Sequence, residues 1–111
     1  SAVLGAIRAA GRHIEAFCHM SHSYHDGACL YFSFFFLIDA ANPIQQWQRI
    51  KQAASNALLK NGAALSHHHG IGSDHLAHLQ KQQGPLARAG LQALKASFDP
   101  EGTLNPGKLM S

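Results

Sequence analysis

Three consecutive histidines, His67, His68 and His69, form the densest group of reactive side chains in the sequence. Histidine is the side chain whose ordinary pKa lies closest to neutral pH, so neighbouring imidazoles can hold and transfer protons. Gly70 and Gly72 follow, and glycine allows both a positive-φ turn and a close approach of the backbone to a ligand. The group is a candidate for proton transfer, for metal binding, or for neither.

A metal site is not favoured by this spacing. Zinc takes three or four ligands that aim inward, whereas adjacent side chains point in different directions. One or two of these histidines could bind a metal together with His22 or His25. A separate pair, His75 and His78, is more typical of a solvated helix surface. We therefore predict no metal. A histidine-rich metal-binding or purely structural domain is the alternative from another class.

A second candidate is Tyr24, which lies between His22 and His25. A phenol beside an imidazole is a competent general acid or base. The Asp-Gly pair that follows is a strong turn signal, so we predict a turn that carries this tyrosine. A tyrosine with no role beyond the turn is the alternative.

Alternating hydrophobicity predicts a strand on either side of this turn. Residues 13–22 alternate between an apolar and a polar face, the pattern of a half-buried strand. Residues 28–38 are apolar on both faces and rich in aromatic side chains, as in a central strand that is covered on both sides. The simplest pairing is an antiparallel hairpin. Residues 2–10, before it, are predicted to end a helix, with Gly11 as a left-handed stop.

Asn42 and Pro43 are favourable residues for the start of a helix over about residues 43–60. After it, the short apolar segment 63–65 is predicted to form a third strand. If this strand adds to the hairpin, it brings the three histidines to the end of the sheet that carries Tyr24.

Two further helices are predicted, a short one capped by Ser73 and another opened by Gly84 and Pro85. A loop then runs to Lys108. The order helix-strand-strand-helix-strand-helix-helix predicts an α+β fold, in which helices pack on an antiparallel sheet.

Composition narrows the functional class. A chain of 111 residues, 46% apolar and 14% charged, is one globular domain or part of one. The net charge of +3 is scattered, which predicts no binding to nucleic acid or membranes. Cys18 and Cys29 fit unpaired thiols in a reducing compartment. The apolar run 30–38 has only about half of the ~20 residues that a membrane-spanning helix needs. We expect a soluble, cytoplasmic protein.

Three stretches, in this order, carry a family resemblance: His22 to Phe32, Ser66 to Gly72, and Leu94 to Lys108. Together they resemble the C-terminal part of the vanillyl-alcohol-oxidase-type flavoproteins, which bind FAD. The likeness is strongest to alkyldihydroxyacetonephosphate synthases and their bacterial relatives. The resemblance implies part of a ferredoxin-like cap domain that closes over the flavin ring. These synthases exchange an acyl for an alkyl group by way of a flavin adduct, as in ether-lipid synthesis.

The resemblance also implies residue roles. The catalytic residues would be Tyr24, His67, His68 and His69, with Tyr24 as the proton-transferring phenol. The cofactor-binding residues would be His69, Gly70, Asn105 and Lys108, the last two in a closing loop near the flavin edge.

The flavin-linked 2-hydroxyacid dehydrogenases of the same superfamily offer a contrast. They carry Glu-His-Gly where this chain has His68-His69-Gly70, and a histidine-rich metal stretch in the hairpin. Here residues 23–28 replace that stretch, and Tyr31 lies near the place of its second histidine. The broken ligand set favours the synthase branch, although an oxidase or dehydrogenase of another alcohol or 2-hydroxy acid stays open.

The resemblance covers nearly the whole chain but only the C-terminal part of the family's proteins. The sequence also starts inside a helical pattern without methionine. We therefore expect the FAD-binding domain upstream of residue 1, as the partner that holds most of the FAD. The substrate would be a small or lipid-like molecule. Alone, residues 1–111 are expected to be inactive and to bind FAD weakly. The apolar strand would then drive self-association into a homo-oligomer.

Overall fold

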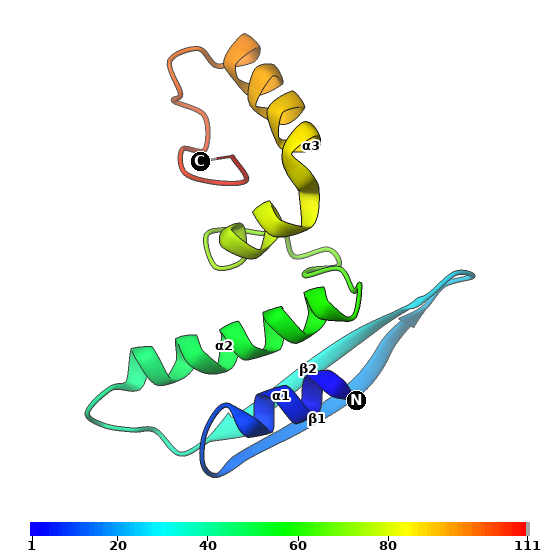
Figure 1. The fold of residues 1–111 in the computed structure, drawn as a ribbon, viewed down its shortest axis with the longest axis vertical. Coiled ribbons are helices and arrows are strands. Elements are labelled where there is room, and N and C mark those ends of the chain that lie inside the picture. Colours follow the sequence, from blue (N-terminus) through cyan, green and yellow to red (C-terminus); the bar gives the residue numbers. More distant parts are fainter. Residues whose placement is uncertain (111) are drawn as a thin grey trace. The chain divides into compact units, whose positions relative to one another are not determined.

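The computed structural model describes residues 1 to 110, and the chain forms two compact units, Ser1–Ala63 and the part from Ala64 onward. The first unit runs from blue to green in Figure 1, and the second from green to red. Each unit carries a different part of the predicted site, so the two are taken in turn.

The first unit contains two helices and an antiparallel hairpin, which confirms the predicted α+β class (Figure 1). Its elements, in chain order, are α1 (Ala2–Ala9), β1 (Ile14–Ser23), β2 (Ala28–Phe36) and α2 (Pro43–Lys60). The strands pair from Ile14 opposite Phe36 to Ser23 opposite Ala28. Asn42 takes the N-cap position of α2 as predicted, but its side chain makes no capping hydrogen bond.

The core of this unit lies under one face of the hairpin, at the end away from the turn. Ile14 and Ala16 of β1 are buried with Val3 and Ile7 of α1 and Ile50 of α2. In β2, alternate phenylalanines pack against this cluster from the paired positions; they are Phe32, Phe34 and Phe36. The turn of the hairpin extends past the ends of both helices in Figure 1. The core therefore holds the base of the hairpin and leaves its tip exposed.

Two side chains tie the hairpin to the helices by hydrogen bonds. Arg8 of α1 donates from Nη2 to the carbonyl of Ala16, at 2.7 Å. The buried amide of Gln46 donates to the carbonyl of Leu37 and accepts from the N–H of Asp39, both at 2.8 Å. Because Leu37 and Asp39 follow β2 directly, this amide fixes the point where the chain leaves the sheet.

The end of α1 differs from the prediction. Gly11 does not adopt a positive φ; His13, just before β1, does so instead, with φ 54°. A Cβ on Gly11 would lie 3.2 Å from the Cδ1 atom of Ile14. The glycine therefore serves the packing of a core isoleucine rather than a left-handed helix stop.

The predicted third strand is wrong. Residues 63–65 form no strand, and the sheet of residues 1–110 has only β1 and β2. Consequently β2 is not a central strand covered on both faces. The face away from the helices carries Phe17, 55% exposed, and Phe35, 68% exposed. A strand that is apolar on both faces implies two apolar neighbours, but residues 1–63 supply only one.

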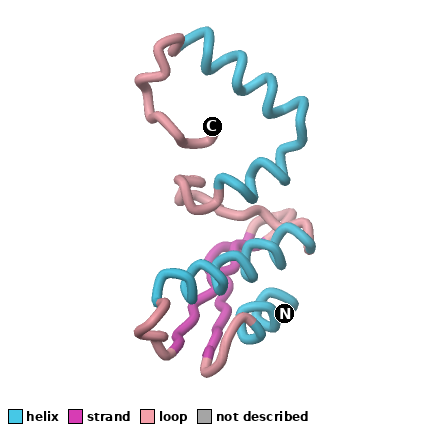
Figure 2. Tube along the Cα trace, turned by 60° about the vertical axis from the view of Figure 1, so that its left-hand side comes forward, coloured by secondary structure: helices cyan, strands magenta, loops and turns pink. Residues whose placement is uncertain are grey.

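The second unit is built on α3 (Leu76–Phe98). Gly84 interrupts it with φ 72° and ψ 163°, and Pro85 follows, so two helical segments meet at a kink at the predicted boundary (Figure 2). The N-cap is His75 rather than the predicted Ser73, and it makes no side-chain capping bond. Within residues 1–110, no helix combines the length and apolarity needed to cross a bilayer.

Candidate functional site

A β-bulge near the tip of the hairpin determines which face His22 lies on. Met20 pairs with Leu30, but the next pair is His22 with Cys29, so the register shifts at Ser21. Directly paired residues share a face of the sheet. Simple alternation would place His22 on the face of Met20, whereas the bulge moves it to the opposite face.

That opposite face carries two stacked pairs of histidine and tyrosine. The rings of His19 and Tyr31 lie 5.3 Å apart between centroids, with 15° between their planes. The rings of His22 and Tyr24 lie 6.3 Å apart, with 10° between their planes. The hydroxyl of Ser21 lies 2.5 Å from Nδ1 of His22 and so helps to orient this imidazole.

Tyr24 is held at the backbone while its side chain stays accessible. Its N–H donates to the carbonyl of Gly27 at 2.8 Å, which closes the predicted turn. The residue is 48% exposed. A phenol in this position is accessible to a ligand and has the imidazole of His22 stacked beside it.

The three consecutive histidines lie in the second unit, in the loop before α3, and all are exposed. The ring of His68 makes edge contacts with both neighbours: its centroid lies 4.6 Å from that of His67 and 4.4 Å from that of His69. The planes are nearly perpendicular, at 81° and 88°. A hydrogen bond joins Nδ1 of His67 to Nδ1 of His68, which requires one of these nitrogens to be unprotonated. The imidazoles of His67 and His68 can therefore pass a proton between them.

The glycines after the three histidines adopt the positive φ that the sequence predicts, 75° at Gly70 and 58° at Gly72. A Cβ at either position would meet no other atom within 4 Å. The backbone beside the histidines is therefore open, and a planar ligand could approach it closely.

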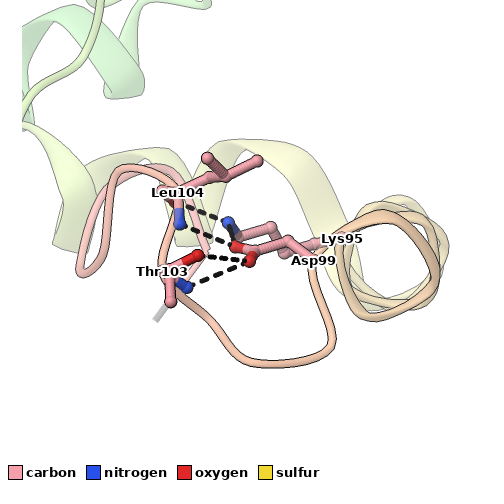
Figure 3. A network of polar contacts seen from close by, with 4 residues as sticks. All are labelled: Lys95, Asp99, Thr103 and Leu104. Carbon is pink, nitrogen blue, oxygen red and sulfur yellow. Dashed lines mark hydrogen bonds and ion pairs between the residues drawn. The ribbon is translucent and has the colours of Figure 1, made fainter.

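The loop after α3 is organised by a buried carboxylate, Asp99 (Figure 3). Its Oδ1 accepts from the N–H of Thr103 at 3.0 Å and from the hydroxyl of Thr103 at 3.2 Å. Its Oδ2 accepts from the N–H of Leu104 at 3.0 Å and from Nζ of Lys95. The same Nζ donates to the carbonyl of Leu104 at 2.5 Å.

The hydrogen bond from Lys95 is the main cause that lowers the pKa of Asp99 to about 2. Burial acts in the opposite direction, and the N–H groups of Leu104 and Thr103 lower the pKa further. Asn105 follows directly, with φ 46°, and Lys108 is half-buried in the same loop. The carboxylate is therefore ionised at neutral pH and holds the segment that carries two of the four predicted cofactor-binding residues, Asn105 and Lys108.

His78, at the start of α3, also has a shifted titration. Burial lowers its pKa, and the positive charge of Lys81 lowers it further. The imidazole is consequently neutral at physiological pH, in keeping with a packing role in this unit.

Residues 1–109 match the family described as FAD linked oxidases, C-terminal domain. The chain belongs to this family. Among curated proteins, its relatives include the alkyldihydroxyacetonephosphate synthases of Trypanosoma brucei brucei and Dictyostelium discoideum, which are 33% identical over 84% and 83% of this chain, respectively. An uncharacterised FAD-linked oxidoreductase of Escherichia coli (strain K12) is 32% identical over 82% of it.

The chain spans 15% of the length of each of the two synthases and 19% of the Escherichia coli protein. No solved structure matches it. Membership of the FAD-linked oxidases confirms the resemblance drawn from the three sequence stretches. It favours a flavoenzyme segment over a metal-binding or structural domain.

The structure brings together only part of the predicted FAD-linked site. Tyr24 joins His22 and the consecutive histidines join one another, but the third strand that would bring Tyr24 to the histidines does not form. A meeting of these groups therefore stays a prediction.

Two features of this site escaped sequence reasoning. The stack of His19 on Tyr31 depends on the strand register, which alternation alone does not give. The other is Asp99, at the C-terminal end of α3. Its spacing of four residues from Lys95 and from Thr103 is the signal that could have identified the network.

Proposed function

We propose that this chain is the part of an FAD-dependent enzyme of the alkyldihydroxyacetonephosphate synthase type that closes over the flavin ring. Such an enzyme would exchange the acyl group of acyl-dihydroxyacetone phosphate for the alkyl group of a fatty alcohol, so that the fatty acid leaves and an ether forms with no net oxidation. The observation that carries the proposal is the exposed phenol of Tyr24 stacked beside the His22 imidazole at the tip of the hairpin. Two relatives bear the name of this synthase, which supports the substrate class.

The described residues fit the ring end of FAD better than its phosphates. The open backbone at Gly70 and the exposed imidazole of His69 suit contact with a flat aromatic ring. The run Gly70-Ile71-Gly72 is too short for a glycine-rich phosphate loop, so another domain would hold the pyrophosphate. Bound FAD would supply the electron-accepting ring chemistry. Residues 1–111 alone should bind FAD weakly and show no activity.

Each residue then has a definite task. Tyr24 transfers a proton to or from a substrate oxygen, with His22 beside it as the nearest imidazole. His67 and His68 are joined by a hydrogen bond through which a proton can pass from one imidazole to the other. His68 and His69 line the substrate and the flavin, and Asn105 and Lys108 approach the flavin edge from their loop.

A second candidate is an oxidase or dehydrogenase of another alcohol or of a 2-hydroxy acid. The Escherichia coli relative supports this second candidate, because its name describes an FAD-linked oxidoreductase. The two candidates differ in electron balance, because acyl-to-alkyl exchange has no net oxidation. Reduction of an electron acceptor by the complete enzyme in the presence of an alcohol or 2-hydroxy acid would favour the second.

The test is Tyr24→Phe in the complete flavoenzyme that contains this chain, with Tyr31→Phe as the matched control. Both tyrosines stack on a histidine of the same sheet face, but only Tyr24 is assigned to proton transfer. Loss of a general acid or base slows reactions about 10²- to 10⁴-fold, so exchange should fall by this amount in Tyr24→Phe with flavin content unchanged. Equal activity of the two variants would contradict the proposal.

We further propose that the isolated chain forms a homo-oligomer in a reducing, cytoplasmic compartment. Exposed Phe17 and Phe35 on an uncovered sheet face support association. Cys18 and Cys29 are both free thiols, in keeping with such a compartment. Sedimentation of the 111-residue chain as a monodisperse monomer would contradict the association.

A further inference from the structure

We infer that Asp99 and Lys95 are positioning residues, which set the loop carrying Asn105 and Lys108 in its flavin-facing conformation before the cofactor arrives. This inference rests on the proposed function in one respect, namely that this loop meets the flavin. Neither residue is assigned to catalysis or to contact with the cofactor.

The first observation is that both backbone polar groups of Leu104 are held. Its N–H donates to Oδ2 of Asp99 at 3.0 Å, and its carbonyl accepts from Nζ of Lys95 at 2.5 Å (Figure 3). A peptide unit is planar and trans, so fixing a carbonyl also fixes the direction of the next N–H. Lys95 therefore sets the orientation of the N–H of Asn105.

The second observation is the conformation of Asn105 itself. Its φ of 46° lies in the left-handed region, which only a minority of non-glycine residues adopt. Such a conformation persists when its surroundings impose it. Here the held peptide of Leu104 stands on one side and Gly107, with φ 70°, follows two residues later. The network thus stabilises the loop shape that presents Asn105 and Lys108.

The third observation concerns the carboxylate. Asp99 accepts four hydrogen bonds, two at each oxygen, although it is almost fully buried. A carboxylate has two accepting oxygens and an amide has one. In Asp99→Asn, whichever way the amide turns, its NH₂ group faces either Thr103 or the pair Lys95 and Leu104. At least one backbone N–H of the loop, that of Thr103 or that of Leu104, therefore loses its acceptor with little change in volume.

The matched control is Glu101→Gln. Glu101 is an exposed carboxylate in the same loop, two residues from Asp99. Its substitution removes the same charge and leaves the hydrogen bonds of Asp99 in place. Lys95→Met tests the other half of the network, since it frees the carbonyl of Leu104.

The first measurement is amide hydrogen exchange at Thr103 and Leu104 in the 111-residue chain. We expect exchange to become about tenfold faster or more in Asp99→Asn and to stay unchanged in Glu101→Gln. Unchanged exchange in Asp99→Asn would overturn the inference, because the carboxylate would not be holding the loop.

The second measurement is the flavin dissociation constant and the visible absorption spectrum of the bound flavin in the complete enzyme. Asp99→Asn and Lys95→Met should raise the constant about tenfold and shift the spectrum, whereas Glu101→Gln should do neither. If amide exchange in the loop becomes faster but the flavin dissociation constant and spectrum stay unchanged, the positioning inference is overturned, whereas the proposed function stands. Absence of flavin from the unsubstituted enzyme would instead overturn the proposed function.

Discussion

Gly70 and Gly62 form a pair that separates a backbone effect from a cofactor effect. Both adopt nearly the same left-handed conformation, with φ 75° and 70°, and neither would place a Cβ within 4 Å of another atom. Gly70 adjoins the consecutive histidines, whereas Gly62 follows α2 and has no assigned role. Substitution by alanine therefore imposes the same local change in two places, of which only one is predicted to face the flavin.

The expected cost to stability is similar in both variants. An L-residue in the left-handed region costs about 1–2 kcal/mol relative to glycine, and no steric clash adds to it. Gly62→Ala and Gly70→Ala should each lower the free energy of unfolding by this amount. Chemical denaturation of the 111-residue chain measures it.

The expected effect on flavin binding differs. An added methyl group in a packed contact typically costs about 1–3 kcal/mol, and 1.4 kcal/mol is a factor of ten in affinity. In the complete enzyme, Gly70→Ala should therefore raise the flavin dissociation constant about tenfold or more, and Gly62→Ala should leave it unchanged. Titration of the apoenzyme with FAD, followed by flavin fluorescence, gives both values. Equal constants for the two variants would refute close approach of the flavin to Gly70.

Three further predictions concern the framework and the histidines. Gln46→Ala should lower the free energy of unfolding in urea by about 2–4 kcal/mol, because the carbonyl of Leu37 and the N–H of Asp39 lose their hydrogen bonds to this amide. The control, Gln45→Ala at an exposed position, should change it by less than about 0.5 kcal/mol. Because the pKa of Asp99 is lowered from 3.8 to about 2, its carboxylate stabilises the folded loop above about pH 4, and this contribution is lost as the pH falls through 2. Protection of the loop amides, measured as their exchange rate relative to that of an unstructured peptide at the same pH, should therefore persist at about pH 5 and disappear near pH 2; its loss already at pH 5 would contradict this account. Zinc titration followed by imidazole NMR resonances should show no stoichiometric tight site at the consecutive histidines; such a site would favour the metal-binding alternative.

Local signals in the sequence predicted most of the framework. Pro43 after Asn42, together with helical spacing, predicted α2 over its observed range, and alternation on either side of Asp-Gly predicted the hairpin. These signals succeed because each depends on residues close together in the chain. The break at Gly84 was predicted for the same reason, since Gly-Pro disrupts a helix wherever it lies.

The failures involve contacts between distant residues. Segment 63–65 is apolar enough for a strand, but a strand also needs a neighbouring strand edge to pair with. The sequence of three residues does not tell whether such an edge is available. The bulge at Ser21 is a property of two strands, so it cannot be read from one. The role of Gly11 depends on the position of the Ile14 side chain. The consecutive histidines and Tyr24 stand out from residue type and spacing alone, but their roles follow only from the family resemblance.

We propose that Tyr24 and His69 act on one substrate beside one flavin. A double-mutant cycle in the complete enzyme tests it most directly, with the rate of acyl-to-alkyl exchange measured for Tyr24→Phe, His69→Ala and the double variant. Groups that act as a unit are strongly non-additive, so the double variant should be about as slow as the slower single variant. If the two losses multiply instead, the phenol and the imidazole act independently, and the shared site is contradicted.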